Sequence, residues 1–403
     1  MNMGTEHKSV RRVVRSASAW ALFFASPVYA ACPTTNQFNF DFATPAAATL
    51  AYGSSFTYTA TSTTLGNTNF TVGFTQNGLT STTVGGEVRP NLSASHNGGG
   101  TNRALVVGGI LSARTADITS ATRVMVTTFT FPTPVRDVSL VMHDVDFTNN
   151  QFRDWIHISG ANGAATYVPT LTTPFGQANG TGPFINPLSS LTLGPVTTAP
   201  ATAVQQAVGT GASGNNSTTG NLNVSFAQPV TSVQVRYGNF PLQSGETATG
   251  QQAFAISTVS WCPMPSLTFA KSSAPFVTAV TDPRRFNAPG SDVIYSLTLT
   301  NSNSSPIDLN QLVFTDPLPS QLTFYNGDID DSGPLTTNFE FVPGTSNLTL
   351  SAANLTYSND GGTSYAYNPA AGYDAVVNAL RFNPQGSMAA NSSSTVRFRA
   401  RIK

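Results

Sequence analysis

The sequence predicts an all-β protein made of two β-sandwich domains, the second of them immunoglobulin-like. Short runs alternate between apolar and polar residues with a period of two, as half-buried strands do. Asn-Gly, Gly-Gly and proline-containing turns separate these runs. No stretch combines a helical period with capping residues. Alternation of this kind buries one face of each sheet, and we therefore expect sandwiches rather than barrels.

The first element, residues 1–30, reads as a secretory signal peptide. A basic start precedes an apolar stretch over residues 17–28, and Val28 and Ala30 stand at −3 and −1 of the expected cleavage site. The sequence therefore predicts export to the periplasm, the cell surface or the extracellular space. No later run approaches the ~20 apolar residues of a membrane-spanning helix, so we expect none in the mature chain.

The second element is an N-terminal β-sandwich domain over residues 31–262. Its predicted strands are residues 38–42, 56–61, 70–75, 124–131, 138–142 and 233–237. Residues 131–140 and 226–235 share Phe, Pro and Val at matching positions, which predicts two strand–proline turn–strand corners or a duplicated half-domain. Residues 170–221 are uncharged and rich in Thr, Gly, Pro and Asn, and we expect long surface loops there with some short strands.

The mature chain keeps two cysteines, Cys32 and Cys262, at opposite ends of this domain. In an oxidising compartment an even pair predicts a disulfide, which here joins the first strand of the domain to its last. The alternative is lipidation of Cys32 after signal cleavage. The residues before Cys32 fit a lipobox poorly, and lipidation leaves Cys262 unpaired.

The third element, residues 263–403, follows a Pro-Met-Pro linker. Residues 293–300 and 396–402 alternate as strands, and Asn359-Asp360-Gly361-Gly362 predicts a hairpin turn. Arg397, Arg399 and Arg401 share one face of the last strand. They either guard an exposed sheet edge or contact an anionic polymer.

Residues 266–403 resemble the bacterial conserved-repeat domain, the eleventh-numbered domain of unknown function. The resemblance rests on Leu267-Thr268-Phe269-Ala270-Lys271, on Pro289-Gly290 before the strand 293–300, on Phe314-Thr315-Asp316-Pro317-Leu318-Pro319 and on the closing alternating strand. It implies an immunoglobulin-like sandwich with a structural or adhesive role at the cell surface, and it implies no catalytic residues. Residues 31–262 bear a weaker resemblance to exported lectin-like β-sandwich modules, through residues 131–146 and 154–160.

The charge content excludes several functions. The 403-residue chain carries 19 Lys+Arg and 19 Asp+Glu, so charged residues make up 9% where about 25% is usual. The chain has no surplus of basic residues to bind a nucleic acid backbone. Its charged residues are also too few to form a salt-bridged coiled coil. Residues 155–235 contain no Asp, Glu, Lys or Arg.

Calcium is the one cofactor that the sequence indicates, because hard cations prefer several oxygen ligands around a turn. Asp144 and Asp146 lie two residues apart, and Asp154 can approach them across a hairpin. The second cluster is Asp328, Asp330 and Asp331, which occupy positions 1, 3 and 4 of an EF-type loop whose twelfth position is Phe339 rather than an acid. In both clusters the alternative is an ordinary solvated acidic turn.

Four aromatic residues in or beside polar segments are candidates for stacking on sugars: Phe152, Trp155, Phe175 and Phe184. Nucleophile-elbow and metalloprotease motifs are missing from the sequence. We therefore expect an exported, non-catalytic structural or adhesion protein with a glycan or a cell-surface protein as partner. The first alternative is a carbohydrate-binding module that depends on calcium, and the distant alternative is a secreted hydrolase.

Overall fold

The computed structural model describes residues 34–46, 49–100, 102–148, 150–174, 183–185, 205–241, 249–277, 287–302, 305–331 and 336–403. This part of the chain is all-β, as predicted, with single-turn 3-10 segments at Thr218–Gly220 and Ala352–Asn354. It contains no helix with the length and apolar character needed to cross a bilayer. The predicted signal peptide, residues 1–30, lies outside the described residues.

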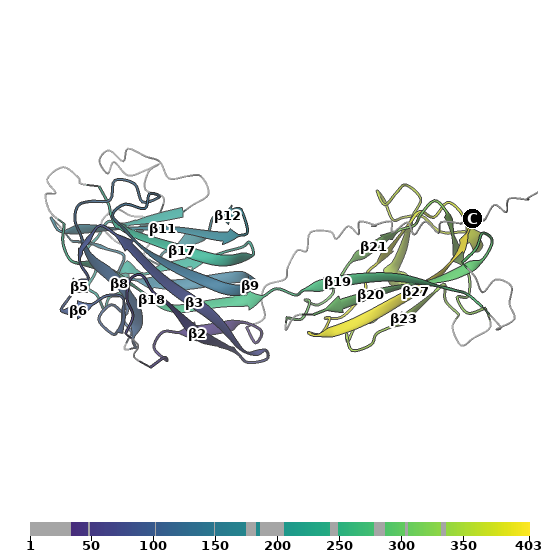
Figure 1. Ribbon diagram of the computed structural model, residues 1–403, viewed down its shortest axis with the longest axis horizontal. Coiled ribbons are helices and arrows are strands. Elements are labelled where there is room, and N and C mark those ends of the chain that lie inside the picture. Colours follow the sequence, from purple (N-terminus) through teal and green to yellow (C-terminus); the bar gives the residue numbers. More distant parts are fainter. Residues whose placement is uncertain are drawn as a thin grey trace, which may run out of the picture.

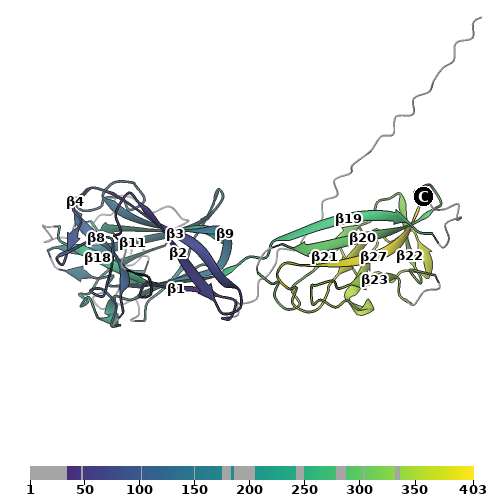
Figure 2. The same ribbon diagram turned by 60° about the horizontal axis from the view of Figure 1, so that its bottom comes forward.

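The strands gather into two lobes that lie end to end (Figures 1 and 2). The N-terminal lobe holds β1 (Phe38–Asp41), β2 (Ser55–Ser62), β3 (Gly66–Asn77), β4 (Leu79–Ser81), β5 (Thr83–Val84), β6 (Glu87–Val88), β7 (Asn91–Ser93), β8 (Ala104–Leu111), β9 (Val124–His143), β10 (Phe147–Thr148), β11 (Phe152–Asn162), β12 (Ala165–Tyr167), β13 (Thr170–Thr172), β14 (Pro183–Ile185), β15 (Gln205–Gly209), β16 (Leu222–Ser225), β17 (Val230–Asn239) and β18 (Gln252–Pro263). The C-terminal lobe holds β19 (Leu267–Pro275), β20 (Asp292–Asn301), β21 (Phe314–Pro317), β22 (Leu322–Asn326), β23 (Phe339–Val342), β24 (Leu355–Ser358), β25 (Gly372–Asp374), β26 (Ala379–Phe382) and β27 (Ser392–Ile402).

The N-terminal sheet closes on itself, which corrects the prediction of an open sandwich for this lobe. Its strands follow the order β9-β3-β2-β1-β18, and β18 pairs with β9 again, so the ring is complete. Closure removes open edges from these strands. The interior is filled by aromatic and aliphatic side chains, and Trp261 packs against Phe38, Phe70 and Phe131 with ring centroids 4.9–6.0 Å apart.

The closure of the sheet depends on the long strand β9, which pairs with strands on both sides of the ring. The sequence predicts two strands joined by a proline turn at residues 132–134, but the structure has one bent strand. The first half of β9 pairs with β3 and β17, and the second half pairs with β16 and β18. Pro132 and Pro134 lie in the exposed bend, where their missing N–H groups cost no ladder hydrogen bond. At the matching residues 226–235, β16 and β17 are separate strands, as predicted.

The C-terminal lobe has two sheets, β19-β20-β27-β22-β25 with β23 on β27, and β21-β26-β24. Side chains from both sheets share one apolar core, and Phe269 on β19 meets Phe314 on β21 at 5.3 Å between ring centroids. The predicted hairpin turn at 359–362 is present, with Gly361 and Gly362 at positive φ. Only a single bridge, Tyr357 to Tyr367, follows it rather than a second strand.

The arginine stripe of the last strand does not guard an edge. Strand β27 lies inside its sheet, between β20 on one side and β22 and β23 on the other. Each arginine pairs with an acid instead: Arg397 with Glu340 at 2.8 Å, and Arg401 with Asp292 at 2.9 Å. Arg399 pairs with both Asp292 and Asp331. The sequence reveals the stripe but not the acids on distant elements that neutralise it.

Candidate functional site

The candidate site lies where β9 ends and β11 begins. Strand β9 stops at His143, and the chain turns back through the short strand β10, which pairs with the start of β11. This turn brings Asp154 on β11 to Asp146, whose carbonyl accepts the Asp154 N–H at 3.0 Å. Asp144, at φ +62°, stands in the left-handed region rather than in a strand. The three aspartates therefore meet through a hairpin, as the sequence predicts for Asp154.

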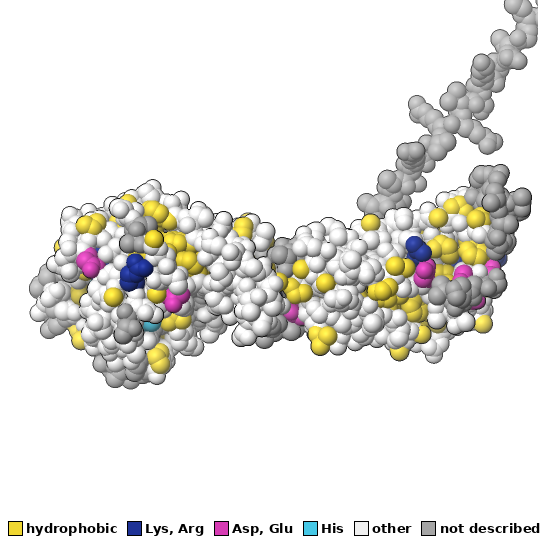
Figure 3. All heavy atoms as spheres, turned by 90° about the horizontal axis from the view of Figure 1, so that it is seen from below, with side chains coloured by type: hydrophobic (Ala, Val, Ile, Leu, Met, Phe, Trp, Pro, Cys, Tyr) yellow, Lys and Arg dark blue, Asp and Glu magenta, His cyan; other side chains and the backbone are white. Residues whose placement is uncertain are grey.

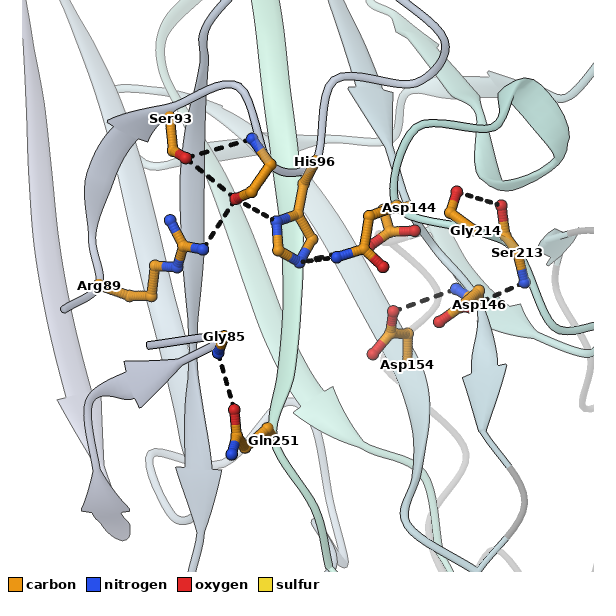
Figure 4. Close-up of polar contacts among 12 residues, drawn as sticks. Gly85, Arg89, Ser93, His96, Asp144, Asp146, Asp154, Ser213, Gly214 and Gln251 are labelled. Carbon is orange, nitrogen blue, oxygen red and sulfur yellow. Dashed lines mark hydrogen bonds and ion pairs between the residues drawn. The ribbon is translucent and has the colours of Figure 1, made fainter. Parts of the chain in front are cut away.

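All three carboxyl groups are buried. Asp144 and Asp146 are each 5% exposed, and Asp154 is fully covered. Asp154 accepts hydrogen bonds from the Tyr237 hydroxyl and, at 3.1 Å, from the Asp146 N–H. Asp146 accepts one from the Ser213 N–H at 2.9 Å. Figure 4 shows the three aspartates side by side between His96 and Ser213.

Asp144 is the least satisfied of the three. Its Oδ2 lies 3.6 Å from Nε2 of His96, and its buried Oδ1 has no hydrogen-bond partner. Within the described residues, none of the three carboxyl groups pairs with an arginine or a lysine. A buried carboxyl without such a partner is costly to ionise.

The electrostatics follow from this burial. Burial, with a smaller contribution from the Asp146 charge, raises the pKa of Asp144 to about 8. Burial also raises the pKa of Asp146 to about 6, against the Ser213 hydrogen bond, and holds the pKa of Asp154 well above its usual range. The pKa of His96 falls to about 4, mainly through burial. At neutral pH His96 is thus uncharged, and its contact with Asp144 is not an ion pair.

His96, Asp144 and Asp146 line a cavity of about 220 Å³, called here the acidic cavity, and Asp154 lies beneath them without lining it. Its wall comes from segments far apart in the sequence, which the closed sheet brings to one end of the lobe. The polar, charged and aromatic side chains among its lining residues are those of His96, Asp144, Asp146, Thr148, Phe152, Ser213, Asn215 and Gln251. The Asn215 amide nitrogen lies 3.1 Å from Nε2 of His96.

Sequence reasoning finds the aspartates but misses His96, Ser213, Asn215 and Gln251. Ser213 and Asn215 belong to the uncharged segment, where Ser, Asn and Gly are so common that no single one stands out. His96 lies in a loop before β8, and β8 lies close to the end of β9 because β18 pairs with both strands. Since these approaches depend on long-range strand pairing, no local motif signals them.

The second predicted calcium cluster has a different environment. The Asp331 carboxylate is 2.6 Å from Nη1 of Arg399, and Asp328 accepts the N–H of Asp330 at 3.2 Å. Residues 332–335 lie outside the described residues. Over the part of the chain that is described, no three or more His, Cys, Asp or Glu side chains form a ready metal centre.

The aromatic candidates for sugar stacking separate into three groups. Trp155 is 1% exposed, packs on Phe240 and donates its indole N–H to Gln206, so it belongs to the core. Phe152 and Phe184 are half-buried, and Phe152 lines the acidic cavity. Phe175 lies outside the described residues.

Only one of the two cysteines of the predicted disulfide lies within the described residues. Cys262 is buried on β18, and its sulfur lies 3.7 Å from the carbonyl of Asn36, near the start of β1. Cys32 lies outside the described residues. Pairing of the two cysteines stays a prediction.

A second hollow, of about 480 Å³, lies on the face of β1, β2 and β18, and is called here the hydroxyl groove. Its polar lining residues are Asn39, Asp41, Thr44, Thr59, Thr61, Thr258 and Ser260. Hydroxyl and amide groups in this density can exchange hydrogen bonds with a polyhydroxylated ligand. Sequence reasoning does not identify this groove.

Comparison with known proteins gives no family. No protein-family model matches the chain, and no curated protein matches it. Among solved structures, a protein from Corynebacterium diphtheriae described as membrane anchored aligns with 83% of this chain and 84% of its own at 10% identity. The TM-score is 0.17, which is too low to carry an argument about fold or function. The resemblance of residues 266–403 to the conserved-repeat domain therefore stays a prediction.

Proposed function

We propose that this chain is an exported, non-catalytic protein that serves a structural or adhesive role at the cell surface. The observation that carries the proposal is the end-to-end arrangement of two β lobes, which suits a module that spans distance (Figure 1). In this proposal residues 31–262 and 263–403 are separate domains, and the second is an immunoglobulin-like conserved-repeat domain. The low charge of the sequence suits an extracellular setting, and Figure 3 shows one face of the molecule with few charged side chains.

The junction between the lobes supports a stiff connection. Strand β18 ends at Pro263 and β19 begins at Leu267, so three residues join the lobes. Nη2 of Arg136, on β9, contacts both carboxylate oxygens of Asp308 in the C-terminal lobe at 3.0 and 3.2 Å. The Ser305 hydroxyl donates to the Pro263 carbonyl at 3.1 Å. A connection held in this way fixes the orientation of one lobe relative to the other, which a flexible linker does not do.

The test is export followed by surface exposure. The full chain and a form lacking residues 2–30 are expressed in a bacterial host, and intact cells are treated with a protease. We expect the full chain to be cleaved after Ala30, exported and accessible, and the shortened form to stay inside. Beads coated with the exported chain should adhere to bacterial cells more than albumin-coated beads do. An unprocessed chain in the cytoplasm, or equal bead adhesion, contradicts the proposal.

The second candidate function is carbohydrate binding, and the hydroxyl groove is the observation that favours it. A glycan array probed with the exported chain tests it directly. Binding that is lost in a Thr59→Ala/Ser260→Ala double variant supports a glycan ligand in the groove. Binding that survives these substitutions places the ligand elsewhere, and an empty array leaves the structural role as the sole proposal.

A further inference from the structure

We propose that Lys271 and Asp316 form an intramolecular isopeptide bond that joins the two sheets of the C-terminal lobe. Lys271 lies on β19, in the sheet that contains β20 and β27, and Asp316 lies on β21, in the other sheet. The inference does not rest on the proposed surface role, because it concerns the chemistry of one contact inside the lobe. It rests on the positions of the two residues, on the geometry of their contact and on their surroundings.

Both residues occupy inward-facing positions of their strands. Along the first half of β19 the half-buried positions are Leu267, Phe269 and Lys271, and the residues between them are exposed. On β21 the buried positions are Phe314 and Asp316. Alternation predicts an apolar residue at such positions, and Phe269 and Phe314 do pack on the core. The lysine and the aspartate therefore meet between the sheets, in a region that strands normally fill with apolar groups.

The amine of Lys271 is in direct contact with the carboxyl group of Asp316. Nζ lies 2.7 Å from Oδ1 and 2.8 Å from Oδ2. Because the two distances are nearly equal, the amine faces the carboxyl carbon that lies between the oxygens. Amide formation requires the nitrogen to be held at that carbon, and groups held in this way react as if at effective molarities of about 10⁵–10⁸ M.

The pair is isolated from other polar groups. Within the described residues, each of the two groups has the other as its sole hydrogen-bond partner. The Asp316 side chain is 2% exposed and that of Lys271 is 18% exposed. By contrast, the buried Asp292 accepts hydrogen bonds from two arginines and a tyrosine. A buried ion pair recovers its desolvation cost only where further hydrogen bonds satisfy both partners. An amide bond removes both charges and with them this cost.

Aromatic rings cover the contact. Nζ of Lys271 lies 4.8 Å from the ring centroid of Tyr295 and 6.0 Å from that of Phe398, and these two rings stack at 5.5 Å. Burial raises the pKa of Asp316 although Lys271 opposes the change, so the site favours the uncharged carboxyl group. Exclusion of water also favours condensation and protects the amide from hydrolysis.

The step is a condensation that the pair completes by itself. A proton first passes from Nζ to the carboxylate along their hydrogen bond, which leaves a neutral amine and a carboxylic acid. Nζ then attacks Cγ, the Cγ–Nζ bond forms, and the bond from Cγ to the hydroxyl oxygen breaks. The hydroxyl leaves with one amine proton as water, so the atoms balance without an oxidant or a co-reactant.

The bond secures the strand that receives the connection between the lobes. Strand β19 begins three residues after the end of β18 and, within the described residues, pairs with β20 alone. A strand held on one side can peel away from its sheet. The bond attaches β19 to a residue 45 positions along the chain, in the other sheet. A force that enters through the connection is then passed to both sheets.

The experiment is mass spectrometry of the purified chain, residues 31–403, after reduction of any disulfide. We expect its mass to be lower than that of its sequence by one water. Trypsin should release residues 237–284 joined to residues 286–381, because it does not cleave after an acylated Lys271 and Asp316 lies in the second peptide. Lys271→Arg keeps the positive charge but cannot form the amide. It should restore the full mass and release residues 286–381 alone.

The matched control is Lys403→Arg, which replaces an exposed lysine whose Nζ donates to the Ser320 carbonyl at 2.8 Å. It should still lose one water and give the joined peptides, and circular dichroism should show that both variants are folded. The proposal is overturned if the unchanged chain has its full mass and releases residues 286–381 alone, since the pair is then an ion pair only. Loss of water that persists in Lys271→Arg places the cross-link elsewhere and also overturns it.

Discussion

At the scale of single residues, the turn that carries the acidic cavity depends on glycines that let backbones touch. A Cβ atom placed on Gly209, the last residue of β15, would lie 1.8 Å from the carbonyl oxygen of Asp146. Gly220 makes a similar approach to Asp144, where a Cβ would lie 2.8 Å from the Asp144 Cα. The positions of Asp144 and Asp146 are therefore set partly by residues that have no side chain.

Gly209→Ala should destabilise the N-terminal lobe, because the new methyl group forces Asp146 and its neighbours to move. Overpacking of this kind lowers the free energy of unfolding by about 1–3 kcal/mol. Urea denaturation followed by tryptophan fluorescence measures the change. Gly214→Ala is the matched control, since its Cβ meets nothing within 4 Å. Equal stability of the two variants would show that the close packing at Gly209 is unimportant.

The same residues show how far the sequence predicts the site. The three aspartates are evident as an acidic cluster, and the hairpin that joins Asp154 to Asp146 follows from the alternation around it. The burial of these carboxyl groups and the approach of His96 and Ser213 are not evident, because both depend on pairing between distant strands. Trp155 illustrates the opposite error: a tryptophan beside a polar segment looks exposed, although the closed sheet buries it.

At the scale of elements, ion pairs hold the central strand of the C-terminal lobe. Asp292, at the start of β20, accepts the Nε–H groups of Arg399 and Arg401 on β27, each at 2.9 Å, and the Tyr373 hydroxyl at 2.6 Å. Asp292 is 1% exposed and the Arg399 side chain 4%. The alternation of β27 predicts its strand, but its place inside the sheet depends on these acids from other elements.

Asp292→Asn should lower the free energy of unfolding of this lobe by about 3–5 kcal/mol, because it leaves the buried Arg399 without its main counter-charge. Asp331→Asn is the control, because its side chain is 37% exposed and an exposed partner contributes about 1 kcal/mol or less. Thermal unfolding of both variants measures the difference. A loss in Asp331→Asn as large as that in Asp292→Asn would contradict the assignment.

Protonation of the Asp292 carboxylate should lower the stability of this lobe in acid. Burial tends to raise the pKa of Asp292, but hydrogen bonds from Arg401, Tyr373 and Arg399 outweigh it and lower the pKa below its usual value. Because the folded pKa is lowered, the stabilisation is complete above the unfolded value of about 4 and is lost as pH falls through the folded value. Urea midpoints measured from pH 6 to pH 2 should fall less steeply below pH 4 in Asp292→Asn than in the unchanged chain.

At the scale of the whole molecule, two lobes with separate apolar cores share one short connection. The sequence predicts this division from its Pro-Met-Pro segment, and predicts the all-β class from alternation. It does not reveal that β9 bends and pairs with strands in two parts of a closed ring. The reason is that local alternation is the same in an open and in a closed sheet. It also does not reveal that Arg136 reaches the other lobe.

The contact between Arg136 and Asp308 should hold the lobes in one orientation. Both side chains are largely covered, at 5% and 10% exposure, so water screens their attraction less than at an open surface. Asp308→Asn removes the charge while keeping the size of the side chain. We expect it to broaden the distribution of distances between fluorophores on the two lobes.

Arg397→Gln is the matched control for this experiment. It also breaks an ion pair, that with Glu340, but both partners lie within the C-terminal lobe. The control should leave the interlobe distances as narrow as in the unchanged chain. Broadening in both variants would mean that any lost charge loosens the molecule. A narrow distribution in Asp308→Asn would mean that the three-residue connection alone sets the orientation, and a stiff module would then need no ion pair at its junction.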